Sequence, residues 1–303
     1  MVDKGRTGRR AGPCRAPRLT RRECLGGLAA AWLGAGPLPA LAEGPARIAC
    51  LEWTSAEMVI SFGIEPVAVA DTKGYRDWVV GPALPAQTID LGARGEPNLE
   101  LLAELKPDFI VGAYGYGLDE SAFARFAPTF NVPFYDGTGT PYRQAEDVTR
   151  ELGLRLGRKA DAERLIAQTA ATIAKVKRGL SGLANEPLAV VSMFDDRHVR
   201  VYGKGSLLQD VLDRLGLVNA WTGETNDWGF SSFGIEELVA IGEARLISLD
   251  PIPPHIRIRI DKSSLWANLP CVRAGKVTTI PPVWPFGGLA AAARFATLLA
   301  EIS

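Results

Sequence analysis

The sequence predicts an α/β protein with two lobes, joined by one long helix and separated by a ligand cleft. Three observations support this fold class. Short apolar strand patterns alternate with helical patterns in both halves of the chain, as they do around parallel sheets. Between the halves, residues 142–184 show no strand pattern, and residues 161–183 have the apolar spacing of one long amphipathic helix. A short sequence pattern also occurs once in each half.

The first lobe is expected at residues 43–158. Thr54 and Glu57 have the spacing of a capping box at the start of its first helix, and Gly63 follows the end of that helix. The predicted strands are residues 47–51, 66–70, 88–91, 108–113 and 132–135, and the predicted helices are residues 54–62, 99–105 and 120–126. This alternation favours a largely parallel sheet.

The linking helix is expected within residues 159–184, and the second lobe at residues 185–303. Ser206 is the predicted N-cap of a helix that ends at Gly216. The other predicted helices are residues 235–241, residues 263–268 and a last helix after Gly288, and the predicted strands are residues 188–194, 198–202, 245–249 and 276–280. The second half is therefore predicted to be another α/β lobe.

The repeated pattern supports two equivalent lobes. Residues 99–105 (LELLAEL) match residues 235–241 (IEELVAI) without a gap, and an apolar strand pattern follows each copy. A match this short also arises by chance, so it supports the two-lobe interpretation without proving it. Two lobes whose strand ends face one another create a cleft, which is the usual ligand position in such folds.

Composition and charge exclude disorder and argue against a nucleic-acid partner. The chain is 47% hydrophobic and 22% charged, within the globular range. Lys plus Arg equal Asp plus Glu at 34 each, but the first 42 residues hold eight basic and two acidic groups. The remaining chain has 26 basic and 32 acidic groups, a net charge of about −6, which gives no reason to expect nucleic-acid binding.

Residues 1–42 have the features of an export signal. Arg21 and Arg22 precede an apolar run at residues 25–41, and a small-x-small processing pattern closes the segment. The arginine pair is typical of the twin-arginine class, which carries folded proteins across the bacterial inner membrane. A membrane anchor is the alternative, but the run is shorter than the ~20 residues that span a membrane and contains two prolines. A cleaved, freely soluble product is therefore expected.

Two cysteines, Cys14 and Cys24, lie in that segment, and two lie beyond it. Cys50 ends an apolar strand pattern, and Cys271 follows a proline late in the chain. Two buried thiols are therefore expected in preference to a disulfide.

The supply of reactive residues favours binding over catalysis. The chain has two histidines, His198 and His255, so a three-histidine metal site cannot be built. It has no Gly-x-Ser-x-Gly elbow, no phosphate-binding P-loop and no complete dinucleotide fingerprint. A ligand-processing enzyme is the alternative, with Ser206, Ser231 or Ser232 as nucleophile, although the pattern places neither histidine beside them.

Aromatic residues in predicted loops, together with one arginine, indicate a binding cleft. Arg94 follows a predicted strand end, and its planar donors suit the oxygens of a metal chelate; an ion pair with Glu96 is the alternative. The tryptophans either line the cleft or cover the edges of a core. Those in predicted loops are Trp53, Trp78, Trp221, Trp228 and Trp284.

Nine stretches, taken together, match one known family. They are residues 51–53 (LEW), 69–72 (VADT), 75–78 (YRDW), 96–102 (EPNLELL), 115–117 (GYG), 219–221 (NAW), 223–226 (GETN), 228–229 (WG) and 272–275 (VRAG). On these residues the chain resembles the periplasmic ferric hydroxamate siderophore-binding proteins of ABC importers, the FhuD type. The resemblance covers nearly all of residues 46–302.

The resemblance implies a class III, chelatase-like periplasmic binding protein with a shallow aromatic cleft. It implies that Arg94 and Tyr116 contact the hydroxamate oxygens around iron. It also places Trp78, Trp228, Trp284 and Asn226 in the pocket. Trp53 is added as a ligand-binding candidate because it follows the first predicted strand. Two departures leave the preferred hydroxamate open: Gly112 stands where the family has an aromatic residue, with Tyr114 nearby as a substitute, and Phe286 replaces a tyrosine.

The implied function is a periplasmic protein, expected to be a monomer, that captures an iron(III)-hydroxamate siderophore and delivers it to an inner-membrane ABC permease. The siderophore holds the iron, so no cofactor and no protein metal ligand are expected. We hypothesise that Glu100 and Glu236, the repeated carboxylates, lie one on each lobe and dock onto arginines of the permease. The alternative is that both are ordinary solvated acids on helices. A binder of haem, a corrinoid or a catecholate siderophore with the same fold is also left open.

Overall fold

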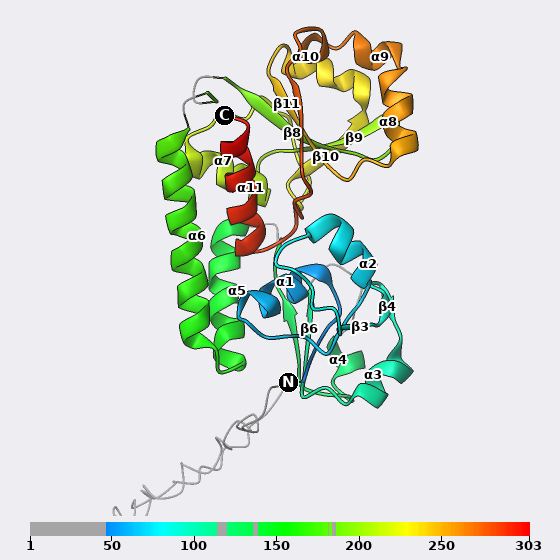
Figure 1. The fold of residues 1–303 in the computed structure, drawn as a ribbon, viewed down its shortest axis with the longest axis vertical. Helices are drawn as coiled ribbons and strands as arrows, with labels where there is room; N and C mark the ends of the chain where they lie inside the picture. The colour runs from blue at the N-terminus through cyan, green and yellow to red at the C-terminus, as the bar shows by residue number, and fades with distance from the viewer. Residues whose placement is uncertain (1–46, 114–119, 136–138, 181, 184–185) are drawn as a thin grey trace, which may run out of the picture. The chain divides into compact units, whose positions relative to one another are not determined.

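Two five-stranded sheets, one in each half of the chain, frame the structure (Figure 1). This computed structural model describes residues 47–113, 120–135, 139–180, 182–183 and 186–303. The described residues all belong to one compact unit. The predicted class, an α/β protein with two lobes and one long helix between them in the chain, is confirmed.

The first sheet is parallel throughout, with the strand order β3-β2-β1-β6-β7. Its strands are β1 (Ile48–Cys50), β2 (Ala68–Val69), β3 (Ile89–Asp90), β6 (Phe109–Ala113) and β7 (Thr129–Val132). A hairpin follows β3 and consists of β4 (Gly92–Ala93) and β5 (Glu96–Pro97). The helices are α1 (Trp53–Ser61), α2 (Thr72–Gly74), the π-helix η1 (Tyr75–Val79), α3 (Leu99–Leu105) and α4 (Glu120–Phe123).

The last strand of this sheet lies earlier than the sequence predicts. β7 pairs with β6 over Thr129–Val132, whereas the apolar pattern predicts residues 132–135. Tyr135 has a left-handed backbone with φ of +57°, which a strand cannot accommodate. Phe134 and Tyr135 are buried in the main core. Their aromatic side chains serve that core, and in the sequence they resemble the end of a strand.

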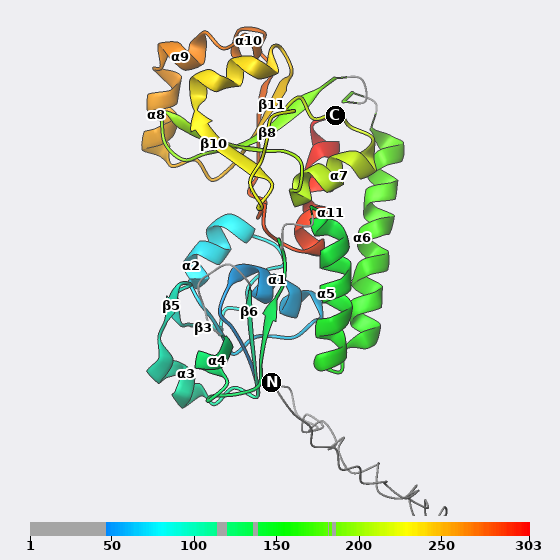
Figure 2. The same cartoon turned by 180° about the vertical axis from the view of Figure 1, so that it is seen from behind.

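Two helices, α5 (Pro141–Arg155) and α6 (Lys159–Gly179), connect the sheets. The long helix predicted over residues 161–183 is α6, but it ends at Gly179. The C-terminal helix α11 (Leu289–Glu301) packs along α6 and also contacts α1, α5 and α7 (Leu207–Leu215), as Figures 1 and 2 show. The end of the chain therefore returns to the helices that join the two sheets.

The second sheet is mixed, with the order β10-β9-β8-β11-β12. Strands β8 (Leu188–Met193), β11 (Arg245–Leu249) and β12 (Val277–Ile280) are parallel, whereas β9 (His198–Tyr202) and β10 (Phe230–Gly234) run antiparallel to their neighbours. Its helices are the 3-10 helix η2 (Ile235–Ile241), α8 (Pro254–Asp261), α9 (Ser264–Ala267) and α10 (Pro270–Arg273).

Strand β10 and helix α8 are not among the predicted elements. β10 reads FSSFG and has no apolar run, because its residues are only partly buried at a sheet edge. In α8, isoleucine alternates with charge, which is a strand-like pattern. The helix nevertheless forms, with Ile256 and Ile260 buried four residues apart and Ile258 exposed.

The two sheets have matching strand orders, although β9 runs antiparallel to β8 where β2 runs parallel to β1. In each, the first strand of its half, β1 or β8, is central, and the adjacent strand β6 or β11 follows the helix α3 or η2. These two helices contain the repeated pattern, so the copies occupy equivalent places in the topology. Leu102 and Leu238 are buried at matching positions, whereas Glu100 and Glu236 are exposed.

The capping box predicted at the start of α1 is wrong. The carboxylate of Glu52 caps α1 instead, accepting the backbone N–H of Thr54. Thr54 donates its hydroxyl to the backbone oxygen of Phe286 at 2.8 Å. Glu57 accepts the backbone N–H of Gly288 at 3.0 Å, just before α11. Both predicted capping side chains are therefore used by a segment that lies more than 200 residues away in sequence.

Other local predictions are confirmed. Ser206 caps α7 by accepting the backbone N–H of Gln209 at 3.0 Å, and Gly216 ends the helix with φ of +79°. Cys50 and Cys271 are separate, buried thiols. Within the described ranges, no helix has both the length and the apolar character needed to cross a membrane.

Candidate functional site

A cavity of about 260 Å³ lies between the two sheets and is lined by both halves of the chain. The first half contributes Trp53, Trp78 and Arg94, and the second contributes side chains of β8, β9 and β11 and of residues 283–286. The predicted cleft between the lobes is therefore present, and six of its fourteen lining residues are aromatic.

Trp53 and Trp284 form a tryptophan pair in this cavity. Their ring centroids are 4.8 Å apart and their planes meet at 70°. The Trp53 Nε1 donates to the backbone oxygen of Asp71 at 2.9 Å, and the Trp284 Nε1 donates to the Thr54 hydroxyl at 3.2 Å. Because both indole N–H groups are already paired and both side chains are buried, the rings are fixed in place and form a rigid apolar floor of the cavity.

Arg94 lies between β4 and β5 at the tip of the hairpin and stacks on the tryptophan pair. Its Cζ is 3.5 Å from the centroid of the Trp53 ring and 5.3 Å from that of Trp284. The Nε lies 3.9 Å from a carboxylate oxygen of Asp71. A guanidinium held over an aromatic ring keeps N–H donors that can meet the oxygens of a chelate.

A second aromatic group consists of Tyr135, Trp228 and Phe286. Tyr135 stacks on Trp228 with ring centroids 5.3 Å apart, and Phe286 meets them edge to face at 5.6 and 5.5 Å. The Tyr135 hydroxyl donates to the backbone oxygen of Pro285 at 2.8 Å. Asn226 accepts the backbone N–H of Trp228 at 3.0 Å, so its Oδ1 holds the turn that carries this tryptophan.

Strand β9 contributes two polar residues that the sequence analysis does not single out. Arg200 and Tyr202 are two residues apart and share the face that lines the cavity. The Tyr202 hydroxyl lies 3.1 Å from the Ser192 hydroxyl. Burial raises the pKa of Tyr202, so its phenol is protonated at neutral pH. The sequence does contain a signal for Arg200, because a charged residue in the middle of the apolar strand HVRVY indicates a polar site on one face.

The predicted site residues separate into three groups. Trp53, Trp78, Arg94 and Trp284 line the cavity, and Trp228 borders it through Phe286. Tyr114 and Tyr116 lie outside the described residues. Asn226 is exposed, and Trp221 packs at 4.9 Å on Phe233 in the core of the second half, where it covers a core edge.

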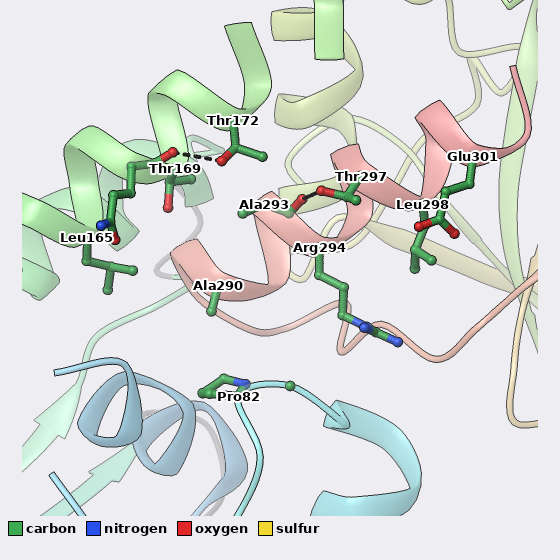
Figure 3. Close-up of a pocket in the computed structure, with 12 residues that line it drawn as sticks. Pro82, Leu165, Thr169, Thr172, Ala290, Ala293, Arg294, Thr297, Leu298 and Glu301 are labelled. Carbon is green, nitrogen blue, oxygen red and sulfur yellow. Dashed lines mark hydrogen bonds between the residues drawn. The ribbon is translucent and has the colours of Figure 1, made fainter. Parts of the chain in front are cut away.

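A larger hollow of about 500 Å³ lies elsewhere, against α6, α11 and the loop at residues 81–82 (Figure 3). Its described lining is made of short aliphatic, hydroxyl and amide side chains, with Arg294 and Glu301. Arg294 already donates its Nε to the backbone oxygen of Pro282 at 2.7 Å. We place the site in the smaller cavity, because that cavity combines fixed aromatic surfaces with arginines.

Two of the three serines considered as nucleophiles, Ser206 and Ser231, have structural partners. Ser206 donates to the backbone oxygen of Gly203 and caps α7, and Ser231 donates to the backbone oxygen of Glu224. His198 Nδ1 lies 2.8 Å from a carboxylate oxygen of Asp195 in the β8–β9 turn. Ser206 and Ser231 therefore donate to backbone oxygens, and the partner of His198 is a carboxylate.

Two α/β lobes with an aromatic cavity between them define a two-lobed ligand-binding protein. Residues 48–283 match the family model described as periplasmic binding protein. The chain belongs to this family.

Similarity to individual proteins extends over most of the chain. It is 38% identical over 260 residues to the iron(3+)-hydroxamate-binding protein FhuD of Escherichia coli (strain K12), covering 86% of this chain and 88% of that protein. The Fe3+-Desferal-bound siderophore-binding protein FhuD from Vibrio cholerae matches with a TM-score of 0.80 and 29% identity, covering 85% and 97% of the chains. FhuD2 from Staphylococcus aureus with bound ferrioxamine B has a TM-score of 0.63 at 19% identity, over 85% and 97%, which is a likeness of fold.

Proposed function

We propose that this chain captures iron(III)-hydroxamate siderophores and delivers them to an ABC permease of the inner membrane. The observation that carries the proposal is Arg94, stacked 3.5 Å from the Trp53 ring centroid within an aromatic cavity. The 38% identical relative is named as an iron(3+)-hydroxamate-binding protein, which supports the same ligand class here.

The chemistry of such a chelate suits the cavity. A tris-hydroxamate satisfies the coordination of iron(III), so the protein needs to recognise only the outer surface of the complex. The Arg94 donors can meet the partly negative hydroxamate oxygens, while the tryptophan pair and Trp78 bury the apolar arms. Micromolar affinity requires only about 8 kcal/mol, which a site of this kind can supply. In this proposal the iron arrives with its ligand, and the chain needs no cofactor of its own.

The proposal includes export and a periplasmic location. Residues 1–42 carry the twin-arginine signal pattern described above, and the family is one of periplasmic binding proteins. We take the active form to be a monomer, because a single chain contributes both walls of the described cavity.

The test is a fluorescence titration of the purified chain with iron-loaded ferrichrome, beside haem and a ferric catecholate. Six of the seven tryptophans lie beyond residue 42, and four of them line or border the cavity, so a bound chelate should quench them. We expect saturable quenching at micromolar or lower concentration by the hydroxamate. A response to haem or the catecholate alone would overturn the ligand class and leave the two-lobed binding role.

A further inference from the structure

A second arginine lines the cavity from the wall opposite Arg94. Arg200 lies in the middle of β9, paired in register with Ser192 of β8 and Ser232 of β10. Its neighbours along the strand, Val199 and Val201, are fully buried on the other face. The alternation of the strand therefore directs Arg200 to the cavity, which it helps to line.

Aromatic rings hold the Arg200 guanidinium in place. Its Cζ lies 3.9 Å from the ring centroid of Phe230, 4.5 Å from that of Phe194 and 5.4 Å from that of Phe286. The Nε of Arg200 is buried and has no hydrogen-bond partner in the described part of the chain. The Tyr202 hydroxyl, two residues along the strand, interacts with the Arg200 side chain and is a neutral partner, so it leaves the positive charge of the guanidinium uncompensated.

In the part of the chain that the structure describes, Arg200 also lacks the carboxylate partner that Arg94 has. Among the described residues, no carboxylate lies within ion-pair distance of Arg200. Asp250, the acidic residue that lines the same cavity, forms an ion pair with Arg257 at 2.7 Å. Arg94 has the carboxylate of Asp71 at 3.9 Å. The described wall of the second lobe therefore carries a net positive charge.

We propose that Arg200 makes this site select ferric hydroxamates that carry a pendant carboxylate over those that carry an ammonium group. Arg94 and the tryptophan pair hold the chelate core, and Arg200 receives the anionic group at the opposite wall through charge-assisted hydrogen bonds. This inference deepens the proposed function and rests on it, because it assumes that a hydroxamate occupies the cavity.

Three ligands with one iron core test the proposal. Ferrioxamine B ends in an ammonium group, its N-acetyl derivative is neutral, and its N-succinyl derivative ends in a carboxylate. Dissociation constants for all three are measured by tryptophan quenching with the wild-type chain, Arg200→Gln and Arg200→Lys. We expect wild type to bind the succinyl form at least about tenfold more tightly than the ammonium form. Arg200→Gln should bring that ratio close to one, and Arg200→Lys should retain part of it.

Arg197→Gln is the matched control. Arg197 is exposed in the preceding turn and does not line the cavity, so its loss removes one charge and leaves the site intact. The neutral ligand reports on folding, since its affinity should change little in any variant. An equal ratio in wild type and Arg200→Gln overturns the role of Arg200. If wild type binds all three ligands equally, selection by charge is overturned and the proposed function stands. If wild type binds none of them, the proposed function itself is overturned.

Discussion

Arg94 shows how a single side chain becomes a recognition element. The hairpin of β4 and β5 places it at a tip, and its Cζ lies over the ring of Trp53, 3.5 Å from the ring centroid. The Asp71 carboxylate, 3.9 Å from its Nε, helps to orient it without covering it, since 22% of the Arg94 side chain stays exposed. Much of the entropy that binding would otherwise remove is therefore already lost in the unbound protein.

Arg94→Gln should weaken binding of a ferric hydroxamate by about ten- to a hundredfold, the loss expected for a charge-assisted hydrogen bond of about 1.5–3 kcal/mol. The measurement is the same quenching titration. Arg76→Gln is the control, because Arg76 is exposed in the same lobe and does not line the cavity. Equal dissociation constants for Arg94→Gln and wild type would contradict the assigned role.

Gly229 supports Trp228 by a backbone contact. Its φ is +74°, and a Cβ at this position would lie 2.1 Å from the backbone nitrogen of Ser206. Gly63 has the same φ of +74° but open space around it, so it serves as a matched control.

Both alanine substitutions incur the left-handed backbone cost of about 1–2 kcal/mol, but only Gly229→Ala must also displace backbone. Gly229→Ala should therefore lose at least about 1 kcal/mol more unfolding free energy in urea than Gly63→Ala. It should also weaken ligand binding by moving Trp228. Equal losses of stability in the two variants would show that the close approach to Ser206 has no energetic weight.

At the scale of the element, α11 depends on a cap supplied by another helix. The N-cap residue of α11 is Gly288, which has no side chain that could accept a backbone N–H of the first turn. The buried Glu57 of α1 accepts the backbone N–H groups of Gly288 and Ala291 at 3.0 Å each. Burial raises the pKa of Glu57 to about 8, with Glu52 adding to the rise and the two backbone hydrogen bonds opposing it. Its Oε2 has no partner among the described residues, as suits a protonated carboxyl group.

A raised pKa in the folded state makes stability depend on pH with a definite sign. The contribution of Glu57 is fully present below its ordinary pKa of 4.5 and is lost as pH rises through about 8. Wild type should lose up to about 1.4 kcal/mol per pH unit in this window. Glu57→Gln, which keeps the acceptor oxygen, should show a flatter dependence when unfolding free energies are measured from pH 5 to 8. Parallel curves for the two proteins would rule out this carboxyl group as the source.

At the scale of the whole molecule, the two lobes present equivalent carboxylates. Glu100 on α3 and Glu236 on η2 are exposed and occupy matching places in the two topologies. This equivalence supports the docking hypothesis, because a permease with two similar halves could receive one carboxylate on each.

Reversing both charges, Glu100→Lys with Glu236→Lys, should abolish siderophore-dependent iron uptake in cells and leave the dissociation constant unchanged. Glu104→Lys with Glu237→Lys is the matched control, since both residues are exposed and lie on the same two helices. Uptake that persists in the first double variant, or is lost equally in the control, would count against specific docking by Glu100 and Glu236.

The sequence alone determined the type and order of most elements, because local signals suffice for them. Ser206 caps its helix through a backbone group three residues away, and Gly216 ends α7 with its left-handed φ. Alternation of apolar patterns likewise identified both sheets. Trp53, Trp78, Arg94 and Trp284 were predictable as cleft residues, since loops at strand ends meet at a cleft in this class of fold.

Only the tertiary structure decided the contacts between distant segments. Thr54 and Glu57 have the spacing of a local capping box, yet partners 232 and 231 residues away take both side chains. Tyr135 imitates a strand residue because it packs on Trp228 and Phe286. Arg200 becomes a cavity residue only when β9 pairs with β8 and β10. In each case the free energy comes from burial and hydrogen bonding between segments that no sequence window contains together, so local propensity cannot reveal it.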